Sequence, residues 1–333
     1  MPFTIVTDLM LAVHPTADYA KVKVGNEFWI MAKQRVNPLM QELGIEEYSI
    51  VEVLPGKKLE GLKYEYPFKD LIPKQAEFDR LPKVHRVICE DFVDVNTATG
   101  VVHLSPGNGE EDFHAARKRD LPIYVPFDDE CKFTDEAGEF KGLFARDADS
   151  KVIEELRKRN LLVHVETVKH EYPTCWRSHH KLIWLARREY FLWTNKINDK
   201  IVEAAEKVKY FYEGPKNRFL AFLKEAKPWC ISRERIWGTP LPVWVCEKCG
   251  NKVLVASRKE ILEKALPNPE TGEKPILPEL HKPWIDRIFF KCEKCGGLMK
   301  REPYVLDTWH NSGASPYARF TDEEFEKFVP VDF

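Results

Sequence analysis

Short runs of alternating apolar and polar residues dominate the first hundred positions and predict a β-rich region. Residues 19–24 alternate with a period of two, and residues 27–31 can return antiparallel after a two-residue turn at Gly25-Asn26. Further short apolar runs, separated by proline and glycine, lie at 49–54, 83–89 and 100–104. Such short, interrupted strands favour a compact barrel over a layered α/β sheet.

Helical periodicity appears at fewer places in this region. Residues 36–43 form a short helical stretch that should end at Gly44, since glycine readily adopts left-handed backbone. Residues 110–119 follow a glycine-rich turn, and residues 149–160 place their apolar side chains on one face. The stretch 161–167 then has the alternation of a strand.

The character of the chain changes near residue 168. Two long amphipathic stretches, 199–208 and 216–226, predict helices, and most of the tryptophans lie beyond this point. We therefore expect a mixed α/β protein with a β-barrel-like first domain at 1–167 and a more helical second part.

Composition narrows the class of protein. The 333 residues are 44% hydrophobic and 12% aromatic, which excludes an intrinsically disordered chain. No run approaches the roughly 20 apolar residues of a membrane helix, so we expect no membrane association. The net charge of −2 argues against a uniformly basic nucleic-acid binder but leaves local patches open. Because Met1-Pro2 begins no secretory signal, we expect a cytoplasmic protein without a disulfide framework.

The pentapeptide Cys-Glu-Lys-Cys-Gly occurs twice, at 246–250 and 292–296. Two cysteines three positions apart form a tight knuckle whose backbone amides point at the sulfurs, and two knuckles supply the four thiolates of a structural zinc site. The predicted ligands are Cys246, Cys249, Cys292 and Cys295. The alternatives are free thiols on two surface hairpins and an iron–sulfur cluster. Because the zinc would have no open position, it would stabilise the 251–291 insert and do no chemistry.

The glycine-rich turn at 105–109 joins a predicted strand to an acidic helix. His103 precedes the turn and Asp112 follows it, so the two side chains can converge across it. Glycines allow a ligand to approach the backbone closely. The acidic first turn would repel phosphate but suits a cationic group such as a substrate ammonium. The alternative is structural: carboxylates that favour a helix N-terminus, and a histidine within the core.

A basic stretch lies between residues 177 and 236. It contains 14 Lys and Arg residues against 7 Asp and Glu residues, and tryptophans are interleaved with it or flank it. Basic groups with aromatic rings can bind phosphates and stack on bases. The alternative is a solvated helix face over an aromatic core, which composition alone favours.

Three strings, in order along the chain, resemble the isoleucyl-tRNA synthetase family. Residues 100–113 are similar to the editing-site motif of that family, residues 227–242 to a catalytic-domain motif and residues 306–313 to a third. The cysteine pairs lie between the second and third strings, as they do in the family. The resemblance covers essentially the whole chain.

The resemblance implies an organisation into four parts. They are an editing domain at 1–167, a returning part of a Rossmann-type class I catalytic domain at 168–245, a zinc-ribbon insert at 246–300, and a continuation of the catalytic domain at 301–333. It implies that this chain is an internal fragment, because the His-x-Gly-His motif for ATP would lie before Met1 and the Lys-Met-Ser-Lys-Ser loop after Phe333. Aminoacylation is therefore expected only of the full-length enzyme, with ATP, isoleucine and tRNA(Ile).

For this chain the resemblance implies hydrolysis of valine wrongly esterified to tRNA(Ile). Asp112 would hold the α-ammonium of the misattached amino acid, His103 would help to keep the pocket too small for isoleucine, and Thr4 would help to place substrate or water. An aminoacyl ester is already activated, so positioned water suffices. Met1 and Phe3 depart from the family, which has threonine and tryptophan at these positions.

On the synthetic side, Trp237 and Trp309 match tryptophans that line the isoleucine pocket of the family. Two alternatives remain: a zinc-stabilised fragment that binds tRNA without catalysis, and a valyl- or leucyl-tRNA synthetase relative. A monomer is expected.

Overall fold

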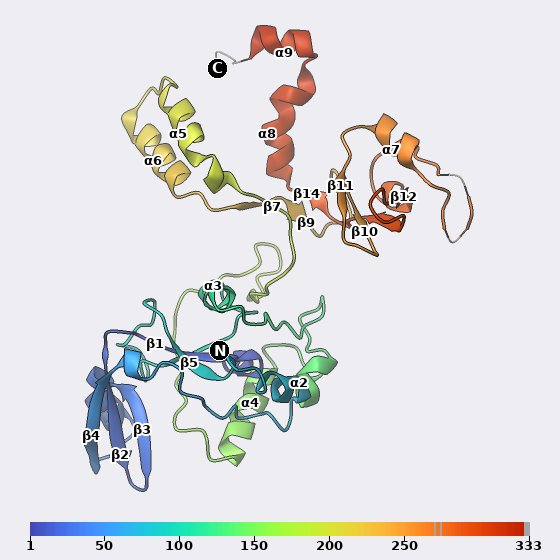
Figure 1. The fold of residues 1–333 in the computed structure, drawn as a ribbon. Helices are drawn as coiled ribbons and strands as arrows, with labels where there is room; N and C mark the ends of the chain where they lie inside the picture. The colour runs from blue at the N-terminus through green and yellow to red at the C-terminus, as the bar shows by residue number, and fades with distance from the viewer. Residues whose placement is uncertain (270, 274, 330–333) are drawn as a thin grey trace. The chain divides into compact units, whose positions relative to one another are not determined.

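The predicted hairpin near the N-terminus forms in the computed structural model, which describes residues 1–269, 271–273 and 275–329. Strands β2 (Asp18–Val24) and β3 (Glu27–Ala32) pair antiparallel, with a turn in which Gly25 has a φ of +57°. Strand β4 (Tyr48–Pro55) pairs with the other edge of β2 and gives the sheet order β3-β2-β4 (Figure 1). Helix α1 (Val36–Glu42) packs its apolar side chains against this sheet.

A second three-stranded sheet lies at the centre of the first half of the chain. Its middle strand, β1 (Met10–Val13), is parallel to β5 (Arg86–Cys89) and antiparallel to β6 (Val102–Leu104). The buried Ala115 and Ala116 of helix α3 (Glu110–Lys118) belong to the same apolar cluster as Met10 and Leu104. These contacts hold the turn between β6 and α3 against the start of β1.

The segment that precedes β1 is a 3₁₀ helix, η1 (Pro2–Thr7). Its Phe3 and Val6 are buried in an aromatic-rich cluster with residues of helix α4 (Ala148–Lys158) and of the 3₁₀ helix η4 (Asp135–Phe140). Helix α2 (Pro73–Phe78) packs on η4. The same half of the chain also contains the short 3₁₀ helices η2 (Lys33–Arg35) and η3 (Gly56–Lys58).

The chain divides into two compact units, Met1–Arg187 and Arg188–Phe333. In the second unit, a four-stranded sheet has the order β11-β10-β13-β12, with strands at Lys252–Leu254, Val243–Cys246, Leu298–Arg301 and Phe290–Lys291. Trp244 of β10 is fully buried in one apolar cluster with residues of α7 (Arg258–Lys264) and of the 3₁₀ helix η6 (Ile285–Arg287).

The rest of the second unit is a helical hairpin, two small strand pairs and two terminal helices. Helices α5 (Asn198–Glu206) and α6 (Glu213–Lys224) pack on each other, and α5 follows the 3₁₀ helix η5 (Thr194–Lys196) (Figure 1). The strand pairs are β7–β8 and β9–β14, at Phe191–Leu192, Trp229–Cys230, Ser232–Arg233 and Val305–Leu306. Helices α8 (Thr308–Arg319) and α9 (Asp322–Phe328) follow.

The mixed α/β prediction is confirmed, and helices form at each of the five predicted stretches. The predicted strand at 161–167 is wrong, because these residues pair with no strand. The alternating side chains of Leu161, Val163 and Val165 are 55%, 58% and 49% exposed, so they are not buried as one face of a sheet strand would be. The barrel, the Rossmann-type part and the domain limits at 167, 245 and 300 stay predictions. No helix among the described residues is long and apolar enough to cross a bilayer.

Candidate functional site

Thr4 and His103 meet at the junction of η1 with the central sheet. His103 lies on β6 opposite Leu11 of β1, and its Nε2 is 2.8 Å from the Thr4 hydroxyl. That hydroxyl donates its one proton to the carbonyl of Met1 at 2.7 Å, so it accepts from His103, and Nε2 carries the proton. Burial lowers the pKa of His103 to about 4. The imidazole is therefore neutral near physiological pH, with Nδ1 as its free acceptor.

Asp112 lies in the first turn of α3, on the far side of the glycine-rich turn. Its carboxylate accepts a hydrogen bond from the backbone amide of Ser105 at 2.8 Å. A side chain at Gly109 would place a Cβ 2.9 Å from the Asp112 carboxyl carbon, so only glycine leaves room for this arrangement. Burial raises the pKa of Asp112 to about 6, and the like charge of Glu111 adds to the effect. The group is ionised near neutral pH and protonated in mild acid.

The structure thus brings Thr4 and His103 into direct contact and attaches Asp112 to the same turn through Ser105. A half-buried anion with a raised pKa has an electrostatic preference for a cation. A neutral imidazole and a hydroxyl beside it can orient an ester or a water molecule. The arrangement contains no nucleophile–base pair in the manner of a serine hydrolase, since the His103 proton is directed at Thr4.

A buried cluster of polar groups supports the turn, and sequence reasoning missed it. The hydroxyls of Thr7 and Ser105 are 2.6 Å apart, and both lie 2.8 Å from the side-chain oxygen of Asn108. The Asn108 amide in turn donates to the carbonyl of Trp184 at 2.9 Å. Ser105 and Asn108 lie within the motif string, but only the structure joins them to Thr7.

Asp8 is a second buried carboxyl close to this turn. It is 3% exposed, accepts a hydrogen bond from the Tyr64 hydroxyl at 2.6 Å, and leaves its Oδ1 without a hydrogen-bond partner. Burial raises its pKa to about 8, so the neutral acid predominates near neutral pH. A single aspartate in an apolar stretch carries no sequence signal that would have identified it.

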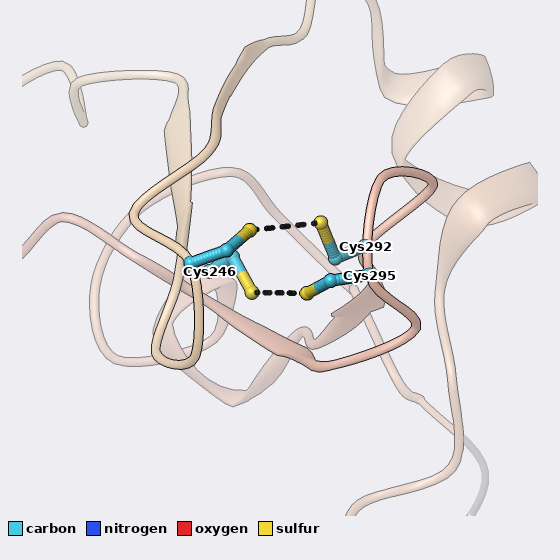
Figure 2. Close-up of side chains that lie close together, drawn as sticks. Cys246, Cys292 and Cys295 are labelled. Carbon is cyan, nitrogen blue, oxygen red and sulfur yellow. Dashed lines mark hydrogen bonds between the residues drawn. The ribbon is translucent and has the colours of Figure 1, made fainter.

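The four predicted cysteine ligands converge in the second unit (Figure 2). Their sulfurs all lie within 4.8 Å of one another, with 3.5 Å between Cys246 and Cys295 and 3.7 Å between Cys249 and Cys292. A zinc ion with Zn–S bonds of about 2.3 Å requires sulfurs about 3.8 Å apart at the corners of a tetrahedron. The donor set therefore fits a structural metal ion.

Each knuckle closes with the same backbone pattern. The amide of Gly250 donates to the carbonyl of Cys246 at 2.9 Å, and that of Gly296 to Cys292 at 2.8 Å. Both glycines have φ near +70°, at +68° and +71°, a left-handed conformation that explains the glycine of the repeated pentapeptide.

The thiols influence one another strongly. Burial raises the pKa of Cys246, but hydrogen bonds from the backbone amides of the knuckle outweigh it and lower the pKa to about 7. A backbone hydrogen bond from Gly297 lowers the pKa of Cys295, but the neighbouring sulfurs of Cys249 and Cys246 raise it to about 12. The four sulfurs cannot all ionise together unless a cation compensates their charge.

The two tryptophans predicted for the synthetic site lie in the second unit. Trp237 is 66% exposed and stacks on His281 at 4.3 Å between ring centroids, and Trp309 is 76% exposed in the first turn of α8. Strands β9 and β14 join the two strings that contain them, and an ion pair between the partly exposed Arg233 and the buried Asp307 reinforces the pairing.

The chain is similar to known proteins over nearly its whole length. Residues 23–333 match the family described as tRNA synthetases class I (I, L, M and V). The protein named isoleucine–tRNA ligase from Methanocaldococcus jannaschii is 42% identical over 98% of this chain and 32% of its own length. Its namesakes from Methanopyrus kandleri and Saccharolobus solfataricus are 38% and 37% identical, over 98% and 99% of this chain and 31% and 33% of their own lengths.

The chain spans about a third of the length of these curated relatives. A solved structure titled "The crystal structure of GlLeuRS-CP1" is 14% identical and covers 50% of this chain and 82% of its own. Its TM-score of 0.38 is too low to establish a shared fold.

Proposed function

Because the chain belongs to the tRNA synthetases class I (I, L, M and V), we propose that it is part of an isoleucine–tRNA ligase and that its first unit edits mischarged tRNA. The reaction is hydrolysis of the ester that links valine to tRNA(Ile). One methylene discriminates substrates by only about 10–200-fold at a synthetic site, so a second, hydrolytic sieve is needed.

The contact between Thr4 and His103, with the Asp112 carboxylate at the same turn, is the observation that supports editing best. Asp112 binds the α-ammonium of the misattached amino acid, which is the cation that its buried charge favours. His103 and Thr4 form the wall that admits valine and excludes isoleucine, and they orient the ester. Water attacks the carbonyl carbon, the ester C–O bond breaks, and the 3′-terminal hydroxyl of the tRNA leaves with a proton from water.

The second unit is proposed to contribute to the Rossmann-type catalytic domain of the whole enzyme, and residues 1–167 are proposed as a barrel-like editing domain. Trp237 and Trp309 would line the isoleucine pocket of the synthetic site. The four cysteines would hold zinc, which neutralises their thiolates and fixes the two knuckles while leaving no open coordination position. ATP, isoleucine and tRNA(Ile) are proposed as partners of the whole enzyme.

Hydrolysis of valyl-tRNA(Ile) by the full chain tests the editing proposal. We expect Asp112→Ala to abolish hydrolysis, because the pocket loses its anchor for the ammonium group. Glu111→Ala is the matched control: Glu111 is exposed in the same first turn of α3, so its loss should leave the rate within about twofold. Equal rates for Asp112→Ala and the unmodified chain would contradict the assigned role.

The competing function, tRNA binding without catalysis, predicts a different result. Binding would weaken steeply with salt, because basic residues release counterions from the tRNA, while the mischarged ester would stay intact. Salt-dependent binding together with undetectable hydrolysis would favour this second function.

A further inference from the structure

Two buried polar side chains converge on the backbone of the segment that presents Thr4. The amide nitrogen of Gln75, on α2, donates to the carbonyls of Val6 at 3.0 Å and Asp8 at 2.9 Å. The Tyr66 hydroxyl lies 3.1 Å from the carbonyl of Ile5 and 3.2 Å from that of Val6. Gln75 is 0% exposed and Tyr66 is 1% exposed, so water cannot replace either contact.

His85 holds both of these side chains. Its ring is 0% exposed, stacks on Tyr66 with 5.0 Å between centroids and an interplanar angle of 8°, and places Nε2 3.2 Å from Oε1 of Gln75. Its Nδ1 is 3.0 Å from Oδ1 of Asp79, which also pairs with Lys63 at 3.2 Å. The residue adopts a φ of +52°, an uncommon backbone conformation for a histidine.

Both ring nitrogens of His85 face oxygen atoms, Oδ1 of Asp79 at Nδ1 and Oε1 of Gln75 at Nε2. Both amide hydrogens of Gln75 are used on backbone carbonyls, so its Oε1 can only accept, and Nε2 of His85 must donate. If Nε2 has no proton, two lone pairs face each other in a site without water, and the Gln75 amide has to turn away from the carbonyls of Val6 and Asp8.

We propose that His85 is a positioning residue for editing, acting through Gln75 on the backbone of η1 and thereby on Thr4. This inference rests on the proposed function. It adds a residue that touches neither the substrate nor Thr4, and that lies outside the three strings of the resemblance. A displacement of about 1 Å at a reacting group can cost about a hundredfold in rate, so a small turn of Gln75 is sufficient to matter.

Two substitutions of His85 separate positioning from stability. His85→Gln keeps a donor near the place of Nε2, so it can still hold Gln75. His85→Asn keeps a donor only near the place of Nδ1, toward Asp79, and leaves Oε1 of Gln75 without a partner. Asparagine tolerates left-handed backbone better than glutamine, so a purely structural role would favour His85→Asn.

The experiment measures kcat and KM for hydrolysis of valyl-tRNA(Ile), together with Tm, for the full chain and both variants. We expect His85→Gln to stay within about threefold of the unmodified chain, and His85→Asn to lose about tenfold or more in kcat with KM little changed. Rates that follow Tm, or an active His85→Asn, would overturn the proposal.

A second readout needs no editing activity. The nitrogen resonances of the His103 ring report on its hydrogen bond to Thr4. They should be unchanged in His85→Gln and shifted in His85→Asn, and unshifted resonances in both variants would overturn the proposal. Failure of the editing proposal itself would give a different result. The unmodified chain would then hydrolyse no valyl-tRNA(Ile), while the His103 resonances would still shift in His85→Asn.

Discussion

Replacement of Asp112 by asparagine is predicted to make the first unit more stable while it removes editing. Asp112→Asn keeps an oxygen that can accept the hydrogen bond from Ser105, which the aspartate accepts at 2.8 Å. What it removes is a half-buried negative charge without a cationic partner, in a place suited to a substrate ammonium.

The magnitude follows from the pKa. Burial raises the pKa of Asp112 from 3.8 to about 6, and a shift of about two pH units corresponds to roughly 3 kcal/mol. The carboxylate also gains up to about 1 kcal/mol from the N-terminus of α3, which asparagine forfeits. Partial exposure of the side chain reduces the difference further. A net gain of about 1–2 kcal/mol in the free energy of unfolding is therefore expected for the variant near neutral pH.

The gain should depend on pH in a definite direction. Well below the unfolded pKa of 3.8, Asp112 is protonated in both the folded and the unfolded chain, and its burial carries no charge penalty. As the pH rises from about 4 to about 6, the unfolded chain loses the proton first, so the unmodified protein loses stability relative to the variant. Above about pH 6 the difference reaches a plateau.

Amide hydrogen exchange at β1, β5 and β6 measures the free energy of opening of the first unit alone, which avoids the mixed unfolding of a two-unit chain. Glu111→Gln, an exposed neighbour in the same turn, removes only the minor contribution of its like charge to the Asp112 pKa, so it should change the free energy of opening by less than about 0.5 kcal/mol near neutral pH. A variant less stable than the unmodified chain near neutral pH, or a difference that does not vary with pH, would contradict an unfavourable negative charge at Asp112.

Three further predictions concern other parts of the molecule. The purified chain should contain about one zinc ion, and its removal by a chelator should raise hydrogen exchange at β10 and β13; less than half an equivalent of any metal would contradict the four-thiolate site. Trp244→Ala should destabilise the second unit by about 3–5 kcal/mol, because the indole is fully buried and donates to the carbonyl of Ile288 at 2.9 Å. Amide hydrogen exchange at β10 measures this loss, and a smaller loss of stability would contradict the prediction. Gln75→Met should lower kcat for editing about tenfold, whereas the control Gln41→Met on the exposed face of α1 should not, and equal rates would contradict the role of Gln75.

Local patterns predicted the elements well where neighbouring residues determine the structure. The β2–β3 hairpin depends on its alternation and on Gly25, and α1 ends before Gly44, which has a φ of +65°. The two cysteine knuckles were predictable because spacing and glycine alone fix their geometry. Residues 161–167 alternate but pair with no strand, because alternation alone does not provide a partner strand.

The candidate site was only partly predictable, for a physical reason. His103 and Asp112 lie within one short string. Gln75 instead contacts η1 at the carbonyl of Val6, 69 positions away in the chain, and His85 acts only through Gln75. Burial of Asp8 likewise depends on Tyr64, 56 positions away. Such polar contacts are satisfied by the tertiary fold and leave no periodicity in the sequence.

The decisive measurement for an editing site at Thr4, His103 and Asp112 is discrimination between two esters. We expect the full chain to hydrolyse valyl-tRNA(Ile) at least about tenfold faster than isoleucyl-tRNA(Ile), measured as kcat/KM under the same conditions, because one methylene in a tight pocket is worth about 1–3 kcal/mol. Equal hydrolysis of both esters, or hydrolysis of neither, would contradict an editing site at Thr4, His103 and Asp112.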